Sequence, residues 1–274
     1  MDESAAERFA ADWLALREPV DARARSLEVL GAARRWAVGR PRIRVLDLGC
    51  GTGSNLRYLC PRLPTVQHWT CLDHDPALIA EFRRRGWDCQ QVVGLDAQVA
   101  SIRATTWLDG VDSDTLVTAS ALLDLVSASW LEEVVARCLD RGAALLFALT
   151  YDGRVEIEPA HPGDREVIAV VNTHQHRDKG LGRALGPGAA DRLTAIGDKL
   201  GYRLAAGDGD WLLGRDESAL AAALLDGWLA AAADQAPGRA AQLASWHSSR
   251  RAAAASGELR IRVGHRDLFL DHST

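Results

Sequence analysis

Cysteine is scarce in this sequence of 274 residues, and the few cysteines are scattered. Five occur, an odd number, and none belongs to a Cys-x-x-Cys pair. Disulfide frameworks use cysteines in even numbers, while structural zinc sites and iron–sulfur clusters take theirs at short spacings. The sequence therefore gives no support to a disulfide framework, a zinc site or an iron–sulfur cluster, and we expect no metal.

Long apolar runs and basic blocks are also absent. No apolar run approaches the roughly 20 residues that cross a bilayer, and the acidic start at Met1–Ser4 is unlike a signal peptide. The formal net charge is −5, and Arg83–Arg85 is the only run of basic residues. A nucleic-acid partner would call for a basic face. We therefore expect a cytoplasmic protein with neither a membrane nor a nucleic acid as partner.

The most informative segment is Arg44–Leu56. It begins with the near-continuous apolar run of a parallel strand that is covered on both faces. Three glycines follow at alternate positions and permit backbone conformations that a Cβ would block: Gly49, Gly51 and Gly53. Ser54 or Asn55 can then cap a helix. The third glycine comes one residue earlier than in the Gly-x-Gly-x-x-Gly turn that binds dinucleotides, which argues against NAD or FAD. The segment predicts a site for a small, nucleotide-like ligand.

A second element appears at the expected distance, in His68–Pro76. In a doubly wound sheet, an acidic residue roughly 20 positions after the glycine turn accepts hydrogen bonds from ribose hydroxyls. Asp73 stands at that point. Asp75 is then better interpreted as the cap of the next helix, with Pro76 at its first position.

Together with Asp47, two residues before Gly49, these segments resemble the first two motifs of the class I S-adenosylmethionine (SAM) dependent methyltransferases. The resemblance continues through a third strand ending at residues 92–97, where Asp96 would lie near the adenine amino group. It also includes a fourth strand and loop at residues 114–125, alongside the methyl group, and a fifth strand at residues 143–150. It covers residues 40–151 well and the rest only loosely.

The resemblance implies SAM as cofactor and S-adenosylhomocysteine as product. The residues expected to bind the cofactor are Asp47, Gly49, Cys50, Gly51, Gly53, Asn55, Asp73, His74, Asp96, Ala97, Ser120 and Arg25. For Asp47, holding the glycine loop through backbone amides and direct contact with the cofactor are both open. An N-terminal pair of helices closes over the cofactor in many members of this family and supplies a cation for its carboxylate. Arg17 and Arg25 are the candidates, unless both are solvated helix residues.

The expected fold is α/β, a doubly wound and mostly parallel sheet of seven strands with helices on both faces. The seventh strand, residues 259–263, is expected to be antiparallel at the sheet edge. We expect a single domain over residues 1–274. Within this domain we expect N-terminal cap helices at 1–40 and a SAM-binding core at 41–151. A substrate or lid insertion follows at 152–186, and residues 187–274 complete the sheet and add two extra helices.

The insertion is where we expect substrate specificity. Residues 164–180 are predicted to form a helix that Asp164 caps and Gly180 ends. His174 lies on the apolar face of this helix, and Asp178 follows one turn later and could orient it. If the acceptor must lose a proton, His174 is the first choice as base, with His161, His176 and His265 as weaker candidates. Asp124, after the fourth strand, is expected either to touch the substrate or to cap the helix that begins near Ser127.

The sequence favours methyl transfer to a small molecule through oxygen, nitrogen or carbon. The loop Ala119–Leu122 lacks the Asn or Asp, two prolines and aromatic residue of enzymes that methylate exocyclic amines of bases. The paired-glutamate loop of protein arginine methyltransferases is absent too. Two alternatives remain: a SAM-binding enzyme of another reaction type, and an inactive SAM-binding regulatory module. The oligomeric state stays open, a homodimer included.

Overall fold

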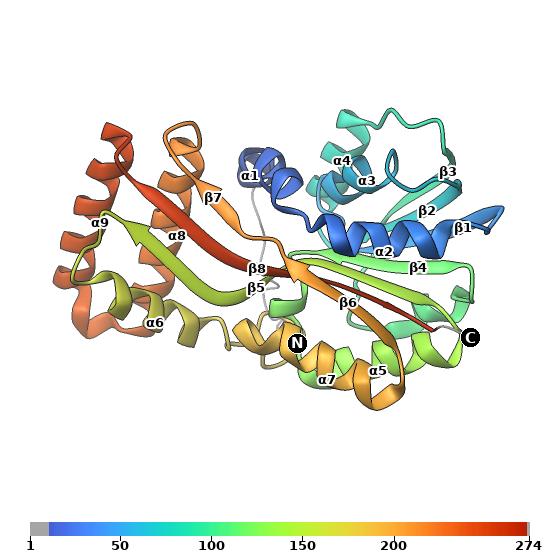
Figure 1. Ribbon diagram of the computed structural model, residues 1–274. Helices are drawn as coiled ribbons and strands as arrows, with labels where there is room; N and C mark the ends of the chain where they lie inside the picture. The colour runs from blue at the N-terminus through green and yellow to red at the C-terminus, as the bar shows by residue number, and fades with distance from the viewer. Residues whose placement is uncertain (1–10, 273–274) are drawn as a thin grey trace.

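The computed structural model describes residues 11–272 and shows a mixed α/β fold built on an eight-stranded sheet (Figure 1). The strands are β1 Arg42–Leu48, β2 Val66–Asp73, β3 Val92–Val99, β4 Thr115–Ser120, β5 Ala144–Glu158, β6 Arg203–Asp208, β7 Trp211–Leu213 and β8 Arg260–Asp271. The α-helices of the described part are α1 Ala11–Ala24, α2 Leu27–Ala37, α3 Ser54–Leu59, α4 Pro76–Arg85, α5 Ala128–Asp140, α6 Asp164–His174, α7 Ala189–Leu200, α8 Ser218–Gln235 and α9 Ala240–Ser256.

The strand order is β3-β2-β1-β4-β5-β8-β6, with β7 paired to β8. The first five strands are parallel, and β8 is antiparallel to its neighbours, as expected. The predicted position of the last strand at the sheet edge is wrong, because β8 lies between β5 on one side and β6 and β7 on the other. The apolar run Leu268–Leu270, buried in full, suits this interior position. Gly209 and Asp210 separate β6 from β7.

Helices cover both faces of the core, as a doubly wound sheet requires. One apolar cluster joins the sheet to α2, α3 and α4, with Trp69 and Phe82 among its fully buried side chains. A second cluster joins the opposite face to α5 and α7, around Leu131 and Leu193. The carboxyl ends of β1, β2 and β4 meet at one edge, where ligands bind in open α/β sheets.

β5 and β8 continue beyond this core. The predicted fifth strand ends at Thr150, but β5 runs on to Glu158 and pairs there with Arg260–Val263 of β8. Helices α6, α8 and α9 pack against the extension around Trp228 and Trp246, which gives it an apolar cluster of its own. Figure 1 shows this lobe projecting from the core. The residues predicted as an insertion and as extra helices therefore form one packed unit.

Helix α1 continues through a proline. Pro19 lies inside α1, which continues to Ala24. A proline in a helix interior removes a hydrogen bond and costs about 3 kcal/mol, so contacts beyond it must fix the second half of the helix. Val20 and Asp21 supply them, since both are buried. Ser26 caps the next helix, α2, through the Val29 amide. Residues 1–10 of the expected N-terminal cap helices lie outside the described residues. Across residues 11–272, none of the helices combines the length and apolar content needed to cross a bilayer.

Candidate functional site

The glycine turn after β1 has the strained geometry that its sequence predicts. Gly49, Gly51 and Gly53 all adopt left-handed conformations, with φ of 63°, 53° and 86°. A Cβ added to Gly53 would stand 2.5 Å from the Phe82 ring. The expectation that Ser54 or Asn55 caps the following helix is wrong, since Gly53 occupies the N-cap without a side-chain hydrogen bond. The Asn55 side chain is turned inward instead.

Asn55 connects a chain of buried polar groups beneath this turn. Its amide nitrogen donates to Asp47 Oδ1 at 2.8 Å and lies 3.2 Å from Thr118 Oγ1. Its amide oxygen accepts a hydrogen bond from Arg25 Nη1 at 3.1 Å. The buried Asn55 side chain therefore links the Arg25 guanidinium to the Asp47 carboxyl group at the end of β1.

Asp47 is the least satisfied acid of the site. It is fully buried, and its Oδ2 has no hydrogen-bond partner. Burial raises the pKa of Asp47 to about 7, while the hydrogen bond from Asn55 acts in the opposite direction. Of the two roles left open for this residue, support through backbone amides is not what the structure shows, because its bonded partner is the Asn55 side chain.

Asp73, at the end of β2, joins the two sequence motifs in space. Its Oδ2 accepts a hydrogen bond from the Gly51 amide at 2.8 Å, and its Oδ1 accepts one from the Asp75 amide at 2.9 Å. Asp75 caps α4 through the Ala77 amide, with Pro76 at the first position, as predicted. The His74 Nδ1 atom lies 3.5 Å from Asp73 Oδ1. The carboxylate therefore holds the glycine turn at the carboxyl edge of the sheet.

The predicted placement of Asp96 and Ala97 at the end of the third strand is wrong. β3 continues to Val99, which is the residue in register with Asp73, whereas Asp96 is in register with Thr70. Asp96 is exposed and accepts a hydrogen bond from the side chain of Gln98. Ala97 is buried in the core cluster. Val99, 53% exposed, is what the strand end presents beside Asp73.

Of the two candidate arginines, only Arg25 reaches the glycine turn. Its side chain is 4% exposed, its Nε lies 3.4 Å from Asp267 Oδ2, and its guanidinium stacks on the Tyr58 ring at 4.5 Å. Arg17 forms an ion pair with Asp21 at 2.9 Å and lies over the Trp211 ring instead.

Asp267 is a buried organising residue that the sequence reasoning did not select. Oδ1 accepts a hydrogen bond from the Leu149 amide at 2.7 Å, and Oδ2 accepts one from the Ser26 amide at 2.9 Å. It thereby ties β5, β8 and the start of α2 together around Arg25. Leu149 has a φ of 53°, which is uncommon outside glycine and is fixed by this bond. The sequence signal was a lone acid directly before the apolar run Leu268–Leu270.

A pocket of about 140 Å³ opens between α1 and α3 beside this network. It is lined by Glu18, Asp21, Ala22, Arg25, Ser54, Asn55, Arg57, Tyr58, Arg62 and Ser120. Of the predicted cofactor residues, Arg25, Asn55 and Ser120 thus share one wall. Cys50 is buried, and its backbone amide donates to the Leu72 carbonyl oxygen on β2 at 3.0 Å.

Helix α1 forms the cover of the pocket. Leu14 lies only 3.1 Å from where a Cβ of Gly51 would stand. Glu18 accepts hydrogen bonds from Arg57 at 2.6 and 2.8 Å and from Arg85 at 3.1 Å. Burial also raises the pKa of Asp21, whose carboxylate accepts a hydrogen bond from the Trp211 indole. These contacts fasten α1 over the glycine turn.

Asp124 lies near the same edge of the sheet, in the short turn Leu123–Leu125 after β4. It is buried, and it does not cap α5, because Ser127 does so through the Trp130 amide. Its charge acts on Tyr151 of β5: burial raises the pKa of Tyr151, and the Asp124 charge adds to that rise. The Tyr151 hydroxyl donates to Asn172 Oδ1 on α6 at 2.6 Å.

The predicted pairing of His174 with Asp178 is wrong. α6 ends at His174, well before Gly180, and Asp178 Oδ1 accepts hydrogen bonds from the Gly180 and Gly182 amides. His174 Nε2 lies 3.2 Å from Asp234 Oδ2 on α8. Burial lowers the pKa of His174, with the nearby Lys179 cation adding to the effect. The helix ends early because the chain turns to bring Arg177 onto Asp234 as well. Asp164 is likewise the first helical residue rather than the cap.

The weaker histidine candidates are each held by the backbone. His161 Nδ1 accepts a hydrogen bond from the Gly163 amide at 3.0 Å, and His176 Nδ1 lies 3.3 Å from the Ala184 carbonyl oxygen. His265 is buried on β8, with Nδ1 3.0 Å from the Val263 carbonyl oxygen. Burial lowers the pKa of His265 to about 3, so its imidazole is neutral near pH 7.

Comparison with known proteins agrees with this geometry. Residues 45–141, about a third of the chain, match the family model described as a methyltransferase domain. The trans-aconitate 2-methyltransferases of Mycobacterium ulcerans and Mycobacterium marinum are each 36% identical over 81 residues, which is 29% of this chain and 26% of theirs. The matched part is thus about a quarter of the length of these curated relatives.

A solved structure extends the likeness to the whole fold. The cyclopropane synthase MmaA2 from Mycobacterium tuberculosis aligns with a TM-score of 0.50 at 12% identity, over 96% of this chain and 95% of that one. At this identity the likeness concerns the fold alone. Residues 45–141 thus match a methyltransferase domain, and they contain the glycine turn and Asp73 at the adjoining strand end.

Proposed function

We propose that the chain transfers a methyl group from SAM to a small organic acceptor. The observation that carries the proposal is a set of unpartnered buried polar atoms and left-handed glycines at and after the carboxyl end of β1. Asp47 Oδ2 and Thr52 Oγ1 are buried without a partner, and three left-handed glycines present their backbone to the same place. Buried polar atoms without partners are rare and call for an explanation, which a bound ligand would supply for these two.

These residues suit the amino-acid end of SAM. Asp47 Oδ2 would accept a hydrogen bond from the ammonium group, and Arg25 would face the carboxylate from the wall of the pocket. Charge-assisted hydrogen bonds of this kind are shorter and stronger than neutral ones. The two side chains already bracket Asn55, so the site is organised for a zwitterion.

The adenosine end would lie at the ends of β2 and β3. Each Asp73 oxygen uses one acceptor position on a backbone amide, which leaves a second position on each for ribose hydroxyls. The exposed Val99 beside it offers an apolar surface for the adenine ring. This replaces Asp96, which lies three residues further back along the strand.

Bound SAM supplies an activated methyl group on a sulfonium, so the protein has to align the acceptor and exclude water. Leu14 and the Glu18 ion pairs hold α1 over the glycine turn and exclude solvent there. Ser120, at the end of β4, lines the pocket, and Asp124 follows it. We assign the acceptor side to this turn and to Tyr151, and we propose Asp124 as the group that accepts a proton.

The acceptor's identity does not follow from the relatives. Trans-aconitate is the substrate in their name, but the match covers only 81 residues. The fold is shared with a cyclopropane synthase, so it does not separate simple methylation from methyl transfer followed by rearrangement.

Two measurements test the proposal. Calorimetry should show SAM and S-adenosylhomocysteine binding to the folded protein with a Kd of about 10 µM or tighter, equivalent to roughly 7 kcal/mol. Incubation of methyl-labelled SAM with a panel of small carboxylates, alcohols and amines should then give a labelled product and S-adenosylhomocysteine. A folded protein without SAM binding would falsify the assignment, and binding without product from any acceptor would favour the regulatory alternative.

A further inference from the structure

The extension of β5 and β8 beyond the core has one covered and one bare face. We call it the arm and define it as residues 155–158 of β5, 211–213 of β7 and 260–263 of β8. Ile157, Ile261 and Val263 are buried on the face that α8 and α9 cover. The residues that alternate with them point to the other face and are exposed.

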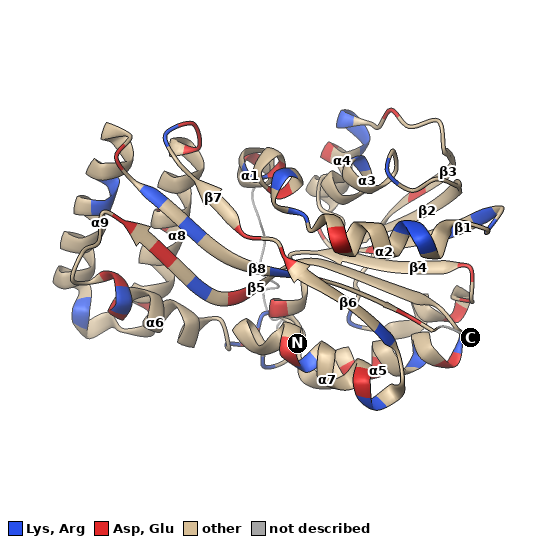
Figure 2. Cartoon of the chain, in the orientation of Figure 1, with Lys and Arg blue, Asp and Glu red and all other residues tan. Residues whose placement is uncertain are grey.

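The bare face of the arm carries one row of acids and one row of bases. Glu156 and Glu158 stand on β5, and Arg260 and Arg262 stand beside them on β8. Figure 2 shows charged residues separated by uncharged ones along both strands. In the register of this antiparallel pair, Glu156 is opposite Arg262, and Glu158 is opposite Arg260.

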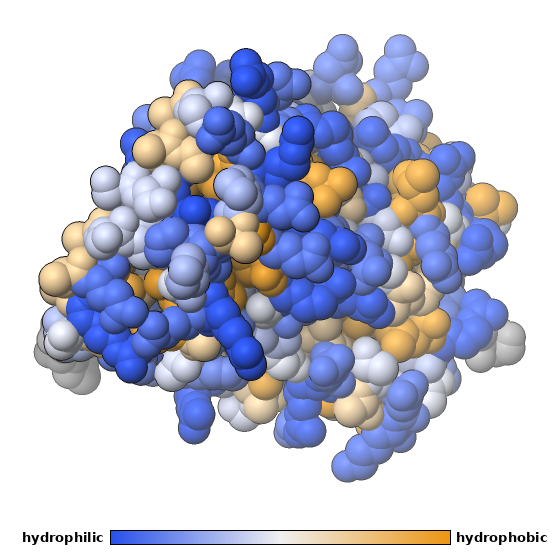
Figure 3. All heavy atoms as spheres, turned by 60° about the vertical axis from the view of Figure 1, so that its left-hand side comes forward, coloured by the Kyte–Doolittle hydropathy of each residue, from blue (hydrophilic) through white to orange (hydrophobic). Residues whose placement is uncertain are grey.

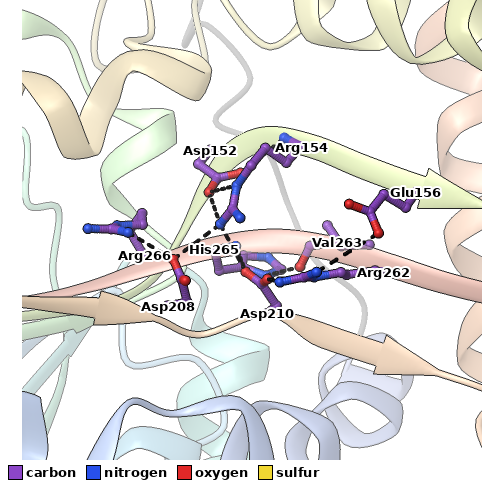
Figure 4. Close-up of polar contacts among 9 residues, drawn as sticks. All are labelled: Asp152, Arg154, Glu156, Asp208, Asp210, Arg262, Val263, His265 and Arg266. Atoms are coloured by element: carbon purple, nitrogen blue, oxygen red, sulfur yellow. Dashed lines mark hydrogen bonds and ion pairs between the residues drawn. The ribbon is translucent and has the colours of Figure 1, made fainter. Parts of the chain in front are cut away.

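Two of these four side chains have ion-pair partners among residues 11–272, and the other two have none. Arg262 is held by Asp210 at 2.6 Å and reaches Glu156 only at 3.9 Å (Figure 4). Within residues 11–272, the side chains of Glu158 and Arg260 form neither a hydrogen bond nor an ion pair. Cross-strand opposite charges normally attract, so two unpaired ones side by side are available to a third group.

We propose that this face is a contact between two copies of the chain. A two-fold axis parallel to the strands, passing between β5 and β8, lays each β5 over the other copy's β8. Because that axis preserves the level along the strand, it sets Glu156 opposite the partner subunit's Arg262. It likewise sets Glu158 opposite the partner subunit's Arg260. An in-plane axis across the strands would instead stack acids on acids.

The contact that follows from this arrangement is ionic and weak. Figure 3, with the arm side forward, shows mainly hydrophilic surface with small, separate apolar areas. Exposed ion pairs contribute little each and are screened by salt. We therefore expect a reversible dimer that salt disperses, and this expectation does not depend on the chemistry of the cofactor site.

Charge reversal tests the geometry. Sedimentation velocity at low ionic strength should show the wild-type chain dimerising at tens to hundreds of micromolar, with the dimer lost at about 0.5 M salt, where the Debye length is only a few ångströms. Arg260→Glu should raise the dimer Kd at least about tenfold, because it sets an acid against the partner subunit's Glu158. Glu158→Arg combined with Arg260→Glu should restore the dimer, since the acid and the base at this one level are exchanged and each again faces an opposite charge.

Arg239→Glu is the control, because it makes the same charge reversal at an exposed arginine away from this face, where Arg239 pairs with Glu166. It should leave the dimer Kd within about twofold of the wild type. Circular dichroism establishes that each variant is folded. A wild-type chain that stays monomeric at low salt overturns the proposal. So does a folded Arg260→Glu variant with an unchanged Kd, or a folded double variant that does not regain the dimer.

Discussion

The Asn55 side-chain amide donates to one oxygen of Asp47 at 2.8 Å and leaves the other oxygen buried without a partner. This half-satisfied carboxyl group is stable enough to persist because burial keeps it largely protonated below about pH 7. The buried, unpartnered oxygen of Asp47 raises its pKa, and the same oxygen is free to bind an ammonium group. The first property affects the pH dependence of stability, and the second affects SAM binding. Both can be measured.

Asp47→Asn should remove a pH dependence of stability. The unfolded chain releases the Asp47 proton near pH 3.8, whereas the native state keeps it to about pH 7. The native state therefore binds more protons in this window, and the free energy of unfolding falls as pH rises through it. At about 1.4 kcal/mol for each pKa unit, the fall is at most about 4 kcal/mol.

Urea unfolding of the wild type and of Asp47→Asn at several pH values between about 4 and 8 checks this. The variant should lose most of the fall. Asp21→Asn is the control, because burial also raises the pKa of Asp21, so each variant should remove only its own share. Identical pH profiles for the wild type and Asp47→Asn would show that Asp47 is ionised in the native protein.

SAM binding should release a proton near pH 6. The ammonium group favours the charged form of Asp47, which is mostly protonated in the free protein at that pH. The binding enthalpy should therefore differ between two buffers of unequal ionisation enthalpy, and the apparent affinity should rise as pH approaches about 7. The difference between buffers should vanish in Asp47→Asn; its persistence there would place the released proton elsewhere.

Asp73→Ala should weaken SAM binding by about a hundredfold or more, equivalent to roughly 3 kcal/mol. The change removes both the ribose acceptor and the hydrogen bond that holds Gly51 in its left-handed conformation. His74→Ala, at the neighbouring and partly exposed position, should change the Kd by less than about fivefold. Calorimetry with S-adenosylhomocysteine measures both. An Asp73→Ala variant that binds as tightly as His74→Ala would contradict the assigned ribose contact.

The cofactor half of the site was predictable because its signals are local in the sequence. The left-handed conformations at Gly49, Gly51 and Gly53 follow from residue type, and the cap at Asp75 follows from a polar residue before a proline. The third strand was expected to end near Asp96, and this end was wrong because strand ends depend on tertiary pairing: β3 continues until Val99 reaches the level of Asp73. The prediction that the last strand lies at the sheet edge was wrong for the same reason, since strand pairing is non-local.

The acceptor half was harder because it depends on contacts between distant segments. His174 has helical neighbours in the sequence that suggested Asp178, but its actual partner, Asp234, lies 60 residues away. Arg25 and Asp267, which are separated by even more of the chain, meet only because β8 is inserted beside β5. Periodicity reports which face of an element is buried, but it does not report what lies against that face.

Turnover should separate Asp124 from His174. Asp124→Asn should lower kcat by about a hundredfold, within the range for loss of a general base, while the Kd for SAM stays within about twofold. The reason is its position: it is buried in the turn that follows Ser120 and interacts electrostatically with Tyr151. His174→Ala should change kcat by less than about threefold, because its ring lies against Asp234 and Arg177 at the end of α8. Methyl transfer from labelled SAM to the identified acceptor, measured across pH, provides both numbers. A large loss in His174→Ala with an intact SAM Kd, beside an active Asp124→Asn, would move the base to α6.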